Sequence, residues 1–512
     1  MINRRGAVRL GIGAGAATAL GGALSAPTAG AAPSGRRRAA GPDWNALRRH
    51  LSGDVVLPGE ADYDRARKIY IGYYDRVRPQ AVAYLDNTED VRTALKFAQD
   101  HAIRPTIRSG GHSFGGYSVS DGLVLNLSRL DTVRLGTRTV HVGPAAQQVD
   151  VLQQLAPQGI AVASGICPGV CPGGFVQGGG LGWLTRQYGM ACDTLVSAQV
   201  VLADGRVVRA SPKEHPDLFW AMRGGGGGNF GVVTRYEMRA FDVRSMVNFQ
   251  LTWPADAAQR LMAAWQNWVI DGPRELGAAL GLQMTDAGSD AVDLMVYGAW
   301  LGAPDRFPAV LDSLISMAGS APATRDIKEL SYRDAMMSWY GCADLTPQQC
   351  HTVGYTPEAK LPRENFALDR NRMFSGPVPD QGLHDMLNVF YADRRPGQFR
   401  YLSLFAFGGA ANDVERTAAA YVHRDTEFYT GFSVGLSDPS PTPEDEAAAR
   451  AWDDKAFAVI DPLSNKESYQ NFIDPALTDW KSSYYGENYE RLTTVKRTYD
   501  PHRLFSFAQG IV

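Results

Sequence analysis

The stretch Gly165–Gly182 constrains the fold of this chain more than any other part of the sequence. It reads Gly-Ile-Cys-Pro-Gly-Val-Cys-Pro-Gly-Gly-Phe-Val-Gln-Gly-Gly-Gly-Leu-Gly. Glycine and proline at this density disfavour both helix and strand, and ordering so much free backbone costs conformational entropy. We expect contact with a large, flat ligand to offset that cost. The sequence therefore predicts an irregular loop folded around a planar molecule.

A second glycine turn lies upstream, in Ser109-Gly110-Gly111. A helix with Thr88 as its N-cap and a short buried strand over Ile103–Arg108 are expected before it. Two adjacent glycines allow unusual dihedral angles, and successive backbone N–H groups in such a turn form a concave anion site. His112 lies at the rim of this predicted site. A glycine turn alone is weak evidence, and the loop downstream strengthens it.

Together, the two loops resemble those of FAD-linked oxidases of the vanillyl-alcohol oxidase superfamily, and most closely its berberine-bridge-enzyme-like branch. The motifs that carry the resemblance are Arg108-Ser109-Gly110-Gly111-His112-Ser113 and Gly165-Ile166-Cys167-Pro168-Gly169-Val170. Further matches follow in the family's order: Gly178-Gly179-Gly180-Leu181-Gly182-Trp183, Tyr188-Gly189, Asp193, Asp217-Leu218-Phe219-Trp220, Arg223-Gly224-Gly225-Gly226 and Tyr484-Tyr485-Gly486-Glu487-Asn488.

The resemblance implies an α+β chain with the two-domain PCMH-type FAD-binding fold, in which a helix-covered antiparallel sheet forms the substrate domain. It implies an FAD-binding domain over residues 65–242, a substrate domain over 243–460, and a segment over 461–512 that returns to the FAD domain. Residues 1–40 are expected to be an export signal and leader.

By the same resemblance, FAD is attached twice: His112 bonds the 8α-methyl carbon of the isoalloxazine, and Cys167 bonds its C6 carbon. Val170 occupies a position where valine in relatives lets oxygen reach the reduced flavin, which favours an oxidase that releases hydrogen peroxide. The other residues expected to contact FAD are Arg108, Ser109, Gly110, Gly111, Ser113, Gly174, Gly178, Gly179, Gly182, Val233, Asn471, Tyr485 and Asn488.

Tyr469, in Tyr469-Gln470-Asn471-Phe472, matches the family's catalytic tyrosine motif. A free tyrosine titrates near pH ~10, so a tyrosine base needs a lowered pKa or must take the proton as the hydride leaves. The alternative is a core tyrosine bonded to backbone. Tyr401 and Tyr429 are candidates for an assisting residue, and His423-Arg424-Asp425 is interpreted as structural support of the substrate domain.

Five cysteines lie at positions 167, 171, 192, 342 and 350. Cys342 and Cys350 enclose a short polar loop, and a disulfide there is one expectation, because an exported protein permits disulfides. A disulfide between Cys167 and Cys171 would compete with the flavin thioether. A metal site at this pair is disfavoured, since no second Cys/His pair lies nearby.

The middle of the chain alternates expected helices and strands, which indicates a sheet covered on one face. Upstream, Asp204-Gly205 predicts a tight hairpin. The expected helices are Asp256–Ile270, Phe307–Met317 and Pro443–Ile460, and the expected strands are Ala279–Met284, Leu294–Trp300, Phe399–Phe407 and Phe428–Val434.

The N-terminus carries a different signal. Arg4-Arg5 precede a run rich in Ala, Gly and Leu from Ala7 to Ala26, and Ala29-Gly30-Ala31 offers a cleavage site near Ala31. This pattern is typical of a twin-arginine signal, with an ordinary secretory signal as the alternative, and predicts a secreted protein that the export machinery recognises. The leader and composition look like those of a high-GC actinobacterial protein. A net charge of −3 gives no reason to expect nucleic acid or a membrane as partner of the mature chain.

The sequence therefore predicts an exported FAD oxidase that acts on an alcohol carbon of a small molecule, such as an antibiotic intermediate, with O₂ as electron acceptor. Two other enzymatic hypotheses remain open. One is oxidation of an oligosaccharide at its anomeric hydroxyl to a lactone, and the other is amine or C–C bond chemistry on an alkaloid-like substrate. A hypothesis from another class is a non-catalytic flavoprotein that sequesters a drug.

Overall fold

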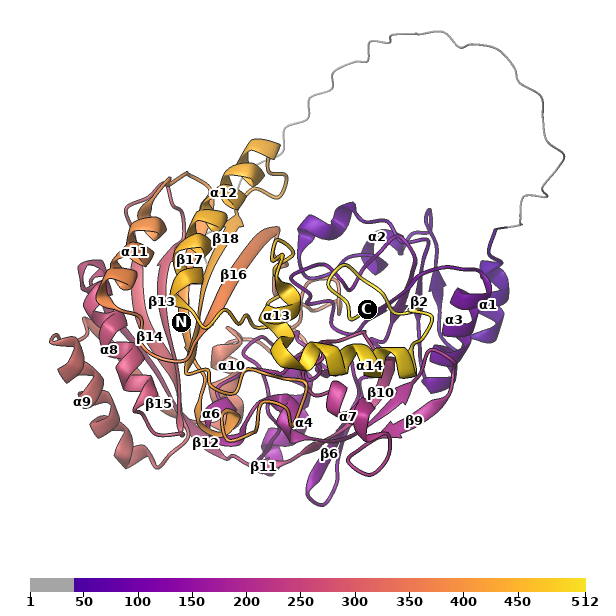
Figure 1. Cartoon of the computed structure of the whole chain (residues 1–512), viewed down its shortest axis with the longest axis horizontal. Coiled ribbons are helices and arrows are strands. Elements are labelled where there is room, and N and C mark those ends of the chain that lie inside the picture. Colours follow the sequence, from indigo (N-terminus) through magenta and orange to yellow (C-terminus); the bar gives the residue numbers. More distant parts are fainter. Residues whose placement is uncertain (1–40) are drawn as a thin grey trace, which may run out of the picture.

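The computed structural model describes residues 41–512, so the predicted export signal and leader over 1–40 lie outside the described residues. The chain forms two lobes, each built on its own sheets (Figure 1). The first lobe comprises residues 41–242, and the second lobe comprises residues 243–460. The chain then returns to the first lobe with residues 461–512. Helices mixed with largely antiparallel sheets confirm the predicted α+β class.

The first lobe begins with a four-stranded sheet that carries the glycine turn at the end of one strand. Its core strands are parallel because α3 forms the crossover between β2 and β3, which both pair with β4. Asn87, not Thr88, caps α3, and its side chain accepts the Asp90 N–H. The lobe starts before residue 65 because β1 pairs with β2 and α1 packs on α3. The elements are α1 (Trp44–His50), β1 (Val55–Val56), α2 (Tyr63–Ala66), β2 (Ala81–Tyr84), α3 (Thr88–Asp100), β3 (Pro105–Arg108) and β4 (Leu123–Asn126).

A second, five-stranded antiparallel sheet completes the first lobe, in the order β5-β6-β10-β8-β9. The predicted hairpin joins β8 and β9, with Gly205 at φ +81° in its turn. The long glycine loop contains one short helix, α5, that the sequence did not predict. The elements are β5 (Val133–Leu135), β6 (Thr139–Val142), α4 (Gln148–Leu155), β7 (Ile160–Ala161), α5 (Pro172–Phe175), α6 (Thr185–Tyr188), β8 (Leu195–Val201), β9 (Val207–Ala210), α7 (Pro216–Ala221), β10 (Val232–Arg239) and β11 (Phe241–Asp242).

The second lobe is one seven-stranded antiparallel sheet, in the order β15-β12-β14-β13-β17-β18-β16. Three of its strands, β12, β15 and β16, were not predicted from the sequence. The elements are β12 (Ser245–Trp253), α8 (Ala258–Ile270), β13 (Leu276–Met284), β14 (Asp293–Trp300), α9 (Phe307–Ala318), β15 (Thr324–Ser331), α10 (Tyr332–Trp339), β16 (Phe366–Phe374), α11 (Asp380–Tyr391), β17 (Gln398–Ala406), β18 (Phe428–Leu436) and α12 (Pro443–Ile460).

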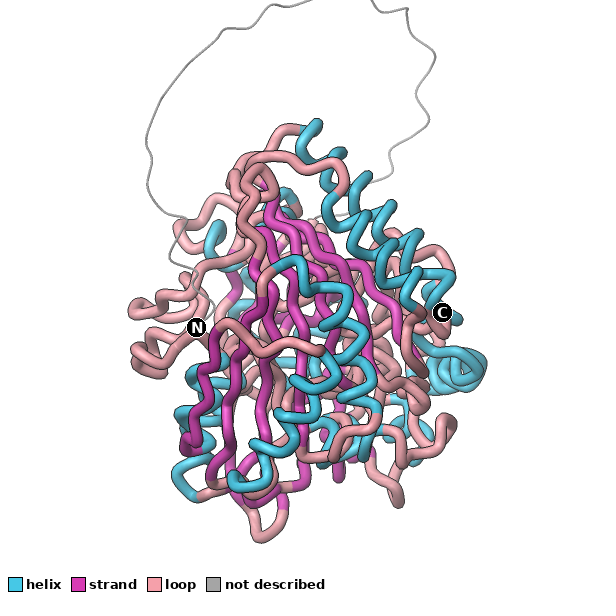
Figure 2. Tube along the Cα trace, turned by 90° about the vertical axis from the view of Figure 1, so that its left-hand side faces the viewer, coloured by secondary structure: helices cyan, strands magenta, loops and turns pink. Residues whose placement is uncertain are grey.

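The two faces of this large sheet have different partners. Helices α8, α11 and α12 cover the outer face, and α9 packs on α8 (Figure 2). Because side chains alternate along a strand, Leu402 and Leu404 of β17 join the core under the helices, whereas Phe405 points the other way. Phe405 shares a core cluster with Trp183 and Tyr469 of the first lobe. The inner face of this seven-stranded sheet therefore covers the first lobe, and we call the sheet the roof.

The end of the chain returns to the first lobe. Helices α13 (Trp480–Tyr485) and α14 (Tyr489–Tyr499) lie along it, and α14 packs against α7 (Figure 1). The Lys496 ammonium is buried and donates to the carbonyls of Asn229 and Phe505 and to the Asp500 carboxylate. The Ile511 N–H donates to the Asn229 side chain. The last residues are thus fastened to a loop of the first lobe.

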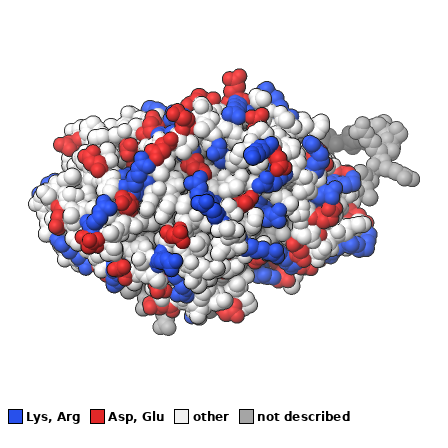
Figure 3. All heavy atoms as spheres, turned by 90° about the horizontal axis from the view of Figure 1, so that it is seen from below, with Lys and Arg blue, Asp and Glu red and all other residues white. Residues whose placement is uncertain are grey.

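The surface carries charges of both signs. Lys and Arg are interspersed with Asp and Glu on the face drawn in Figure 3, and no large area of that face has a single sign. Within residues 41–512, no helix combines the length and the apolar character that crossing a bilayer requires. In the same residues, no group of three or more His, Cys, Asp or Glu side chains could hold a metal ion.

Candidate active site

A cavity of about 350 Å³ lies in the first lobe at its contact with the second. Both glycine-rich loops line it, and so do segments from the end of the chain. The lining includes Ser109–Phe114, Gly165–Cys167, Gly226–Asn229, Tyr469–Ile473 and Phe505–Phe507. Parts of the chain far apart in sequence therefore meet around one space.

The turn after β3 supplies unpaired donors to this cavity. Within the described residues, the backbone N–H groups of Gly110, Gly111, His112 and Ser113 donate to no protein acceptor. A Cβ at Gly110 would lie 2.8 Å from the Cys171 Sγ, so only glycine lets the two loops approach this closely. Adjacent free N–H groups in a turn attract an anionic group, such as a phosphate.

Two nucleophilic side chains line the same cavity. Burial lowers the pKa of His112 to about 4, so its imidazole is neutral near pH 7 and keeps a lone pair for bond formation. The ring stacks on Tyr70 with 4.0 Å between centroids. Cys167, from the other loop, also lines the cavity and is partly buried.

The other cysteines settle the disulfide alternatives. Cys342 and Cys350 form a disulfide, which confirms the expectation for this pair. Cys167 and Cys171 are not joined. The Cys171 thiol is buried and donates to the Ala145 carbonyl at 3.2 Å, and burial raises its pKa, so it stays protonated. Nothing in this arrangement competes with a thioether at Cys167.

These features fit a flavin dinucleotide. The free N–H groups suit its pyrophosphate, and the cavity is mainly apolar, as a ring system requires. Gly174 has open space where a Cβ would stand, so a ligand can lie directly against the backbone there. His112 and Cys167 are the residues that would hold the ring covalently.

Most residues predicted to contact the cofactor do line this cavity. These are Ser109, Gly110, Gly111, His112, Ser113, Cys167, Val170, Gly174, Val233, Asn471 and Tyr485, and Tyr469 joins them. The sequence interpretation missed Tyr117, Gln177 and the aromatic pair Phe505 and Phe507. The last two follow the final helix, where no glycine motif marks a ligand.

Five predicted contacts lie outside the lining and serve the protein itself. The Arg108 guanidinium donates to the carbonyls of Ala66 and Ser118, so it stabilises the chain next to the Ser109–Gly111 turn. The Asn488 amide donates to the carbonyls of Arg416 and Ala419.

The three glycines outside the lining mark close approaches between chain segments. A Cβ at Gly178 would collide with the Asn471 side chain, and one at Gly182 with the Ser164 carbonyl. Gly179 has φ +121° and faces the Tyr421 ring. Packing within the protein is enough to require glycine at all three positions.

Tyr469 is buried at the cavity, where its phenolic oxygen accepts two hydrogen bonds. The Gly180 N–H donates at 2.8 Å and the Asn471 amide at 3.1 Å. Burial raises the pKa of Tyr469, and these two donors oppose that rise because they stabilise the phenolate. Within residues 41–512, the hydroxyl hydrogen of Tyr469 has no protein acceptor, so the hydroxyl is available to a substrate.

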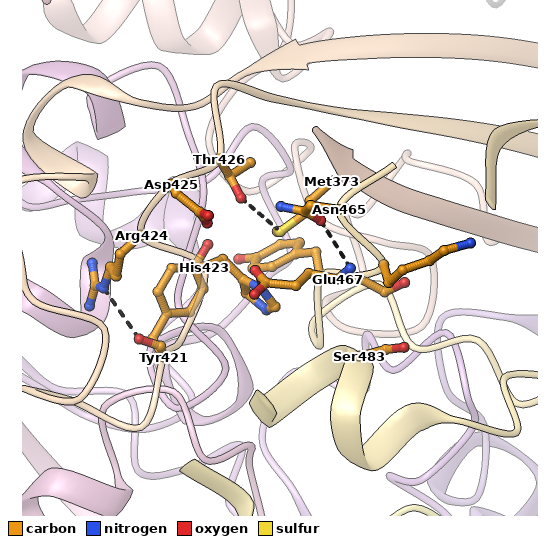
Figure 4. A network of polar contacts seen from close by, with 12 residues as sticks. Met373, Tyr421, His423, Arg424, Asp425, Thr426, Asn465, Glu467 and Ser483 are labelled. Atoms are coloured by element: carbon orange, nitrogen blue, oxygen red, sulfur yellow. Dashed lines mark hydrogen bonds and ion pairs between the residues drawn. The ribbon is translucent and has the colours of Figure 1, made fainter. Parts of the chain in front are cut away.

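The loop that carries Tyr469 is held by His423. This buried ring contacts the Glu467 carboxylate at 2.7 Å and the Gln470 side chain at 2.9 Å, on either side of Tyr469 in sequence (Figure 4). Burial alone would raise the pKa of Glu467, but His423 and Arg416 lower it to about 2. The supporting role predicted for this motif matches these contacts, which link the second lobe to the loop of Tyr469.

Arg424, next in the chain, joins the lobes by a buried ion pair. Its guanidinium binds both oxygens of Asp193 in the first lobe, at 2.8 and 2.7 Å. Because Arg424→Ala leaves a buried carboxylate unpaired, we expect it to lower the free energy of unfolding by about 3–5 kcal/mol. Arg274→Ala, which breaks a pair exposed by more than half on both sides, should leave the free energy of unfolding almost unchanged. Equal midpoints for the two variants in urea would contradict this assignment.

A row of polar side chains crosses the roof above the site. Gln283, Tyr401, Ser433 and Asp369 are direct neighbours on β13, β17, β18 and β16, and all four are partly exposed. We call these four residues the polar row. The Tyr401 hydroxyl contacts the Tyr297 hydroxyl at 2.6 Å. Tyr429 lies deeper, where it packs against Phe472 and its hydroxyl contacts Ser403.

Asp369 is the functional candidate that the sequence interpretation missed. Burial raises its pKa to about 6, although Ser433 and Asn371 donate to it. Asn371 also accepts the Tyr469 backbone N–H at 3.0 Å, so one amide connects the Asp369 carboxyl to the loop of Tyr469. The i, i+2 spacing of Asp369 and Asn371 on a strand was the available signal.

Comparison with known proteins agrees with this site. Two family models match, "FAD binding domain" over residues 79–211 and "Berberine and berberine like" over residues 468–512. The uncharacterized FAD-linked oxidoreductase YgaK of Bacillus subtilis is 28% identical over 468 residues, which cover 90% of this chain and 97% of that protein. The glucooligosaccharide oxidase of Sarocladium strictum is 28% identical over 453 residues, with 83% and 86% covered.

The fold comparison extends over nearly the whole chain. A solved structure of glucooligosaccharide oxidase from Acremonium strictum, described with 6-S-cysteinyl, 8α-N1-histidyl FAD, superimposes with a TM-score of 0.79 at 25% identity. The match covers 91% of this chain and 98% of that one, and it confirms the predicted two-domain FAD-binding fold. With both family models, the cavity and the shared fold in agreement, the chain is similar to the berberine-bridge-enzyme-like FAD-linked oxidases.

Proposed function

We propose that this protein oxidises an alcohol carbon of a small molecule, with Tyr469 as the base and O₂ as the final electron acceptor. The observation that carries the proposal is the Tyr469 hydroxyl, which accepts two hydrogen bonds and has no acceptor for its own proton within residues 41–512. Bound FAD supplies the hydride acceptor and passes the two electrons to O₂, which gives hydrogen peroxide.

The protein's own groups do the remaining work. The Gly180 N–H and the Asn471 amide stabilise the phenolate form of Tyr469, which then accepts the proton of the substrate hydroxyl. Asn371 connects Asp369 to the loop of Tyr469, and we propose that Asp369, once ionised, orients that hydroxyl by accepting a hydrogen bond. Val170 lines the cavity beside Cys167, and we propose that it leaves room for O₂.

A carbohydrate is the second candidate substrate, and the polar row favours it. Amide, hydroxyl and carboxyl groups side by side suit a substrate with several hydroxyls, such as an oligosaccharide oxidised at its anomeric carbon to a lactone. The glucooligosaccharide oxidase among the relatives is named for an oligosaccharide substrate. An aromatic antibiotic intermediate offers fewer hydroxyls to this polar row than an oligosaccharide does.

We further propose that FAD is bound covalently by His112 and Cys167 and that the protein is secreted through its twin-arginine signal. A covalent bond gives the cofactor permanence outside the cell, where dilution would remove a reversibly bound flavin. In this proposal the partners of the mature chain are a small-molecule substrate and O₂, with neither nucleic acid nor membrane.

The function is tested by peroxide release from purified protein. A panel of gluco-, xylo- and chito-oligosaccharides is compared with aromatic polyketide alcohols and alkaloid amines, with the Tyr469→Phe variant as the control. Substrate-dependent peroxide identifies an oxidase, and the active group identifies the substrate class. A compound that perturbs the flavin spectrum without reducing it under anaerobic conditions indicates sequestration and overturns the enzymatic proposal.

The raised pKa of Asp369 predicts a specific pH dependence. The useful form is the carboxylate, which is lost as the pH falls through about 6, so kcat of the wild type should decline below that pH. Asp369→Asn should lower kcat by about 10²-fold and remove this acidic limb, because an amide does not titrate. Ser433→Ala, which removes a donor to Asp369, should keep the limb and move it to higher pH. An unchanged limb in Asp369→Asn would exclude this role.

A further inference from the structure

One segment of the second lobe reaches both predicted attachment points. Residues 342–365 leave the end of α10, cross to the first lobe and lead into β16. We call them the disulfide strap, because the Cys342–Cys350 disulfide closes their first turn. Both half-cystines are fully buried, so this end of the strap is fixed in the core.

The near end of the disulfide strap holds the loop of Cys167. His351, directly after Cys350 and 4% exposed, contacts the Gln147 side chain at 2.9 Å and Asp150 at 3.2 Å. Gln147 is the N-cap residue of α4. The first N–H groups of α4 donate in turn to the carbonyls of Val170 and Pro168, at 3.0 and 3.1 Å. His351 thus fixes the helix end on which the Cys167–Val170 turn rests.

The far end of the disulfide strap lies beside His112. Arg363 donates to the Ile69 carbonyl and to both oxygens of Asp75. Glu364 accepts the hydroxyl hydrogen of Tyr70 at 3.1 Å, and its carbonyl accepts the Gly72 N–H at 2.7 Å. Tyr70 is the ring that stacks on His112. One continuous segment therefore contacts the supports of both nucleophiles.

We propose that the disulfide strap sets the distance between Cys167 and His112 and thereby positions Cys167 for its bond to flavin C6. The inference rests on the bicovalent attachment proposed above. A rigid ring offers its two carbons at one fixed separation, so the second bond forms only where the protein already holds the thiol at that distance from the imidazole. His351 is then a positioning residue that acts through Gln147 and α4.

The thioether step balances with O₂ as oxidant. The Cys167 S–H bond and the flavin C6–H bond break, one C–S bond forms, and the two hydrogens with their two electrons leave on O₂ as hydrogen peroxide. The disulfide strap takes no part in this exchange. It determines only how often the thiol is in place.

The test maps flavin linkages in peptides of denatured, digested full-length protein. In Cys342→Ser/Cys350→Ser and in His351→Ala, we expect the fraction with flavin bonded to Cys167 to fall by roughly tenfold or more, while the His112 bond persists. His351→Asn, which keeps a donor toward Gln147, should restore most of the thioether. Cys192→Ser removes another buried cysteine outside the disulfide strap and should leave both bonds intact.

The outcomes separate the two levels of the proposal. Unchanged thioether in both strap variants overturns the positioning role, while the bicovalent assignment stands. A parallel loss of the His112 and Cys167 linkages also overturns the positioning role, because that pattern indicates general destabilisation. Thermal unfolding of each variant measures that destabilisation. Wild-type protein without any linked flavin overturns the attachment and the strap together. If the double cysteine variant does not fold, His351→Ala and His351→Asn alone decide the positioning role, because both variants retain the disulfide.

Discussion

Tyr469→Phe is expected to lower kcat by about 10²–10⁴-fold while FAD stays attached. The substitution removes the only atom proposed to accept the substrate proton and leaves the ring in place. The Gly180 N–H and the Asn471 amide then lose their acceptor, so the loss is chemical as well as structural. Stopped-flow measurement of flavin reduction without oxygen isolates the affected step. The flavin content of the variant should equal that of the wild type.

Tyr421→Phe is the matched control for this prediction. Tyr421 is also buried, its ring lies 6.5 Å from that of Tyr469, and its hydroxyl has no hydrogen-bond partner within the described residues. Removing that hydroxyl should change the rate of flavin reduction by less than about threefold, because it touches no reacting group. Similar losses in the two variants would assign the effect to packing and exclude Tyr469 as the base.

The second large effect is the loss of covalent flavin in His112→Ala/Cys167→Ala. Wild-type protein precipitated with trichloroacetic acid should stay yellow, and each single variant should stay yellow through its remaining bond. The double variant should release all its colour, since no linkage is left. Intact-mass spectrometry checks the same point, as the added mass of one flavin nucleotide disappears only in the double variant.

Cys171→Ala is the control for cysteine removal in the cavity wall. Cys171 lines the same cavity, but burial raises its pKa and keeps the thiol protonated, so it is a poor nucleophile. Its removal should leave both linkages. Release of all the flavin by one of the single variants, His112→Ala or Cys167→Ala, would refute two independent bonds.

The glycine-rich loops and the regular elements around them were accessible from the sequence. Strand β3, the hairpin at Asp204-Gly205 and the helices α8, α9 and α12 of the second lobe follow local patterns, and local patterns decide such elements. The N-cap of α3 differed by one residue, because Asn87 and Thr88 are both capable caps and only the backbone conformation selects between them.

Strand β16 of the roof was not predicted for a physical reason. It reads Phe-Ala-Leu-Asp-Arg-Asn-Arg-Met-Phe, and its charged residues obscure the buried run of residues 370–374. Arg370 and Arg372 are buried because Asp474 and Asp461 pair with them from distant segments. Such partners cannot be read from the strand itself, so the i, i+2 spacing of Asp369 and Asn371 was not recognised as one face of a strand.

The glycines of the long loop show a related limit. Gly174 leaves space for a ligand, whereas Gly178 and Gly182 leave space for other parts of the protein. In sequence the two kinds are identical, since each merely lacks a Cβ. Only the identity of the neighbour, which the fold supplies, separates a binding glycine from a packing glycine.

The fastening of the chain's end has a consequence for biogenesis. Phe505, Phe507 and Gln509 form part of the cavity wall, and Lys496 and Ile511 secure that wall to Asn229. A nascent polypeptide that stops short of Phe505 lacks this wall. Premature termination anywhere upstream of Phe505 therefore yields a product with an open pocket. We expect flavin loading to require that synthesis has passed Gln509.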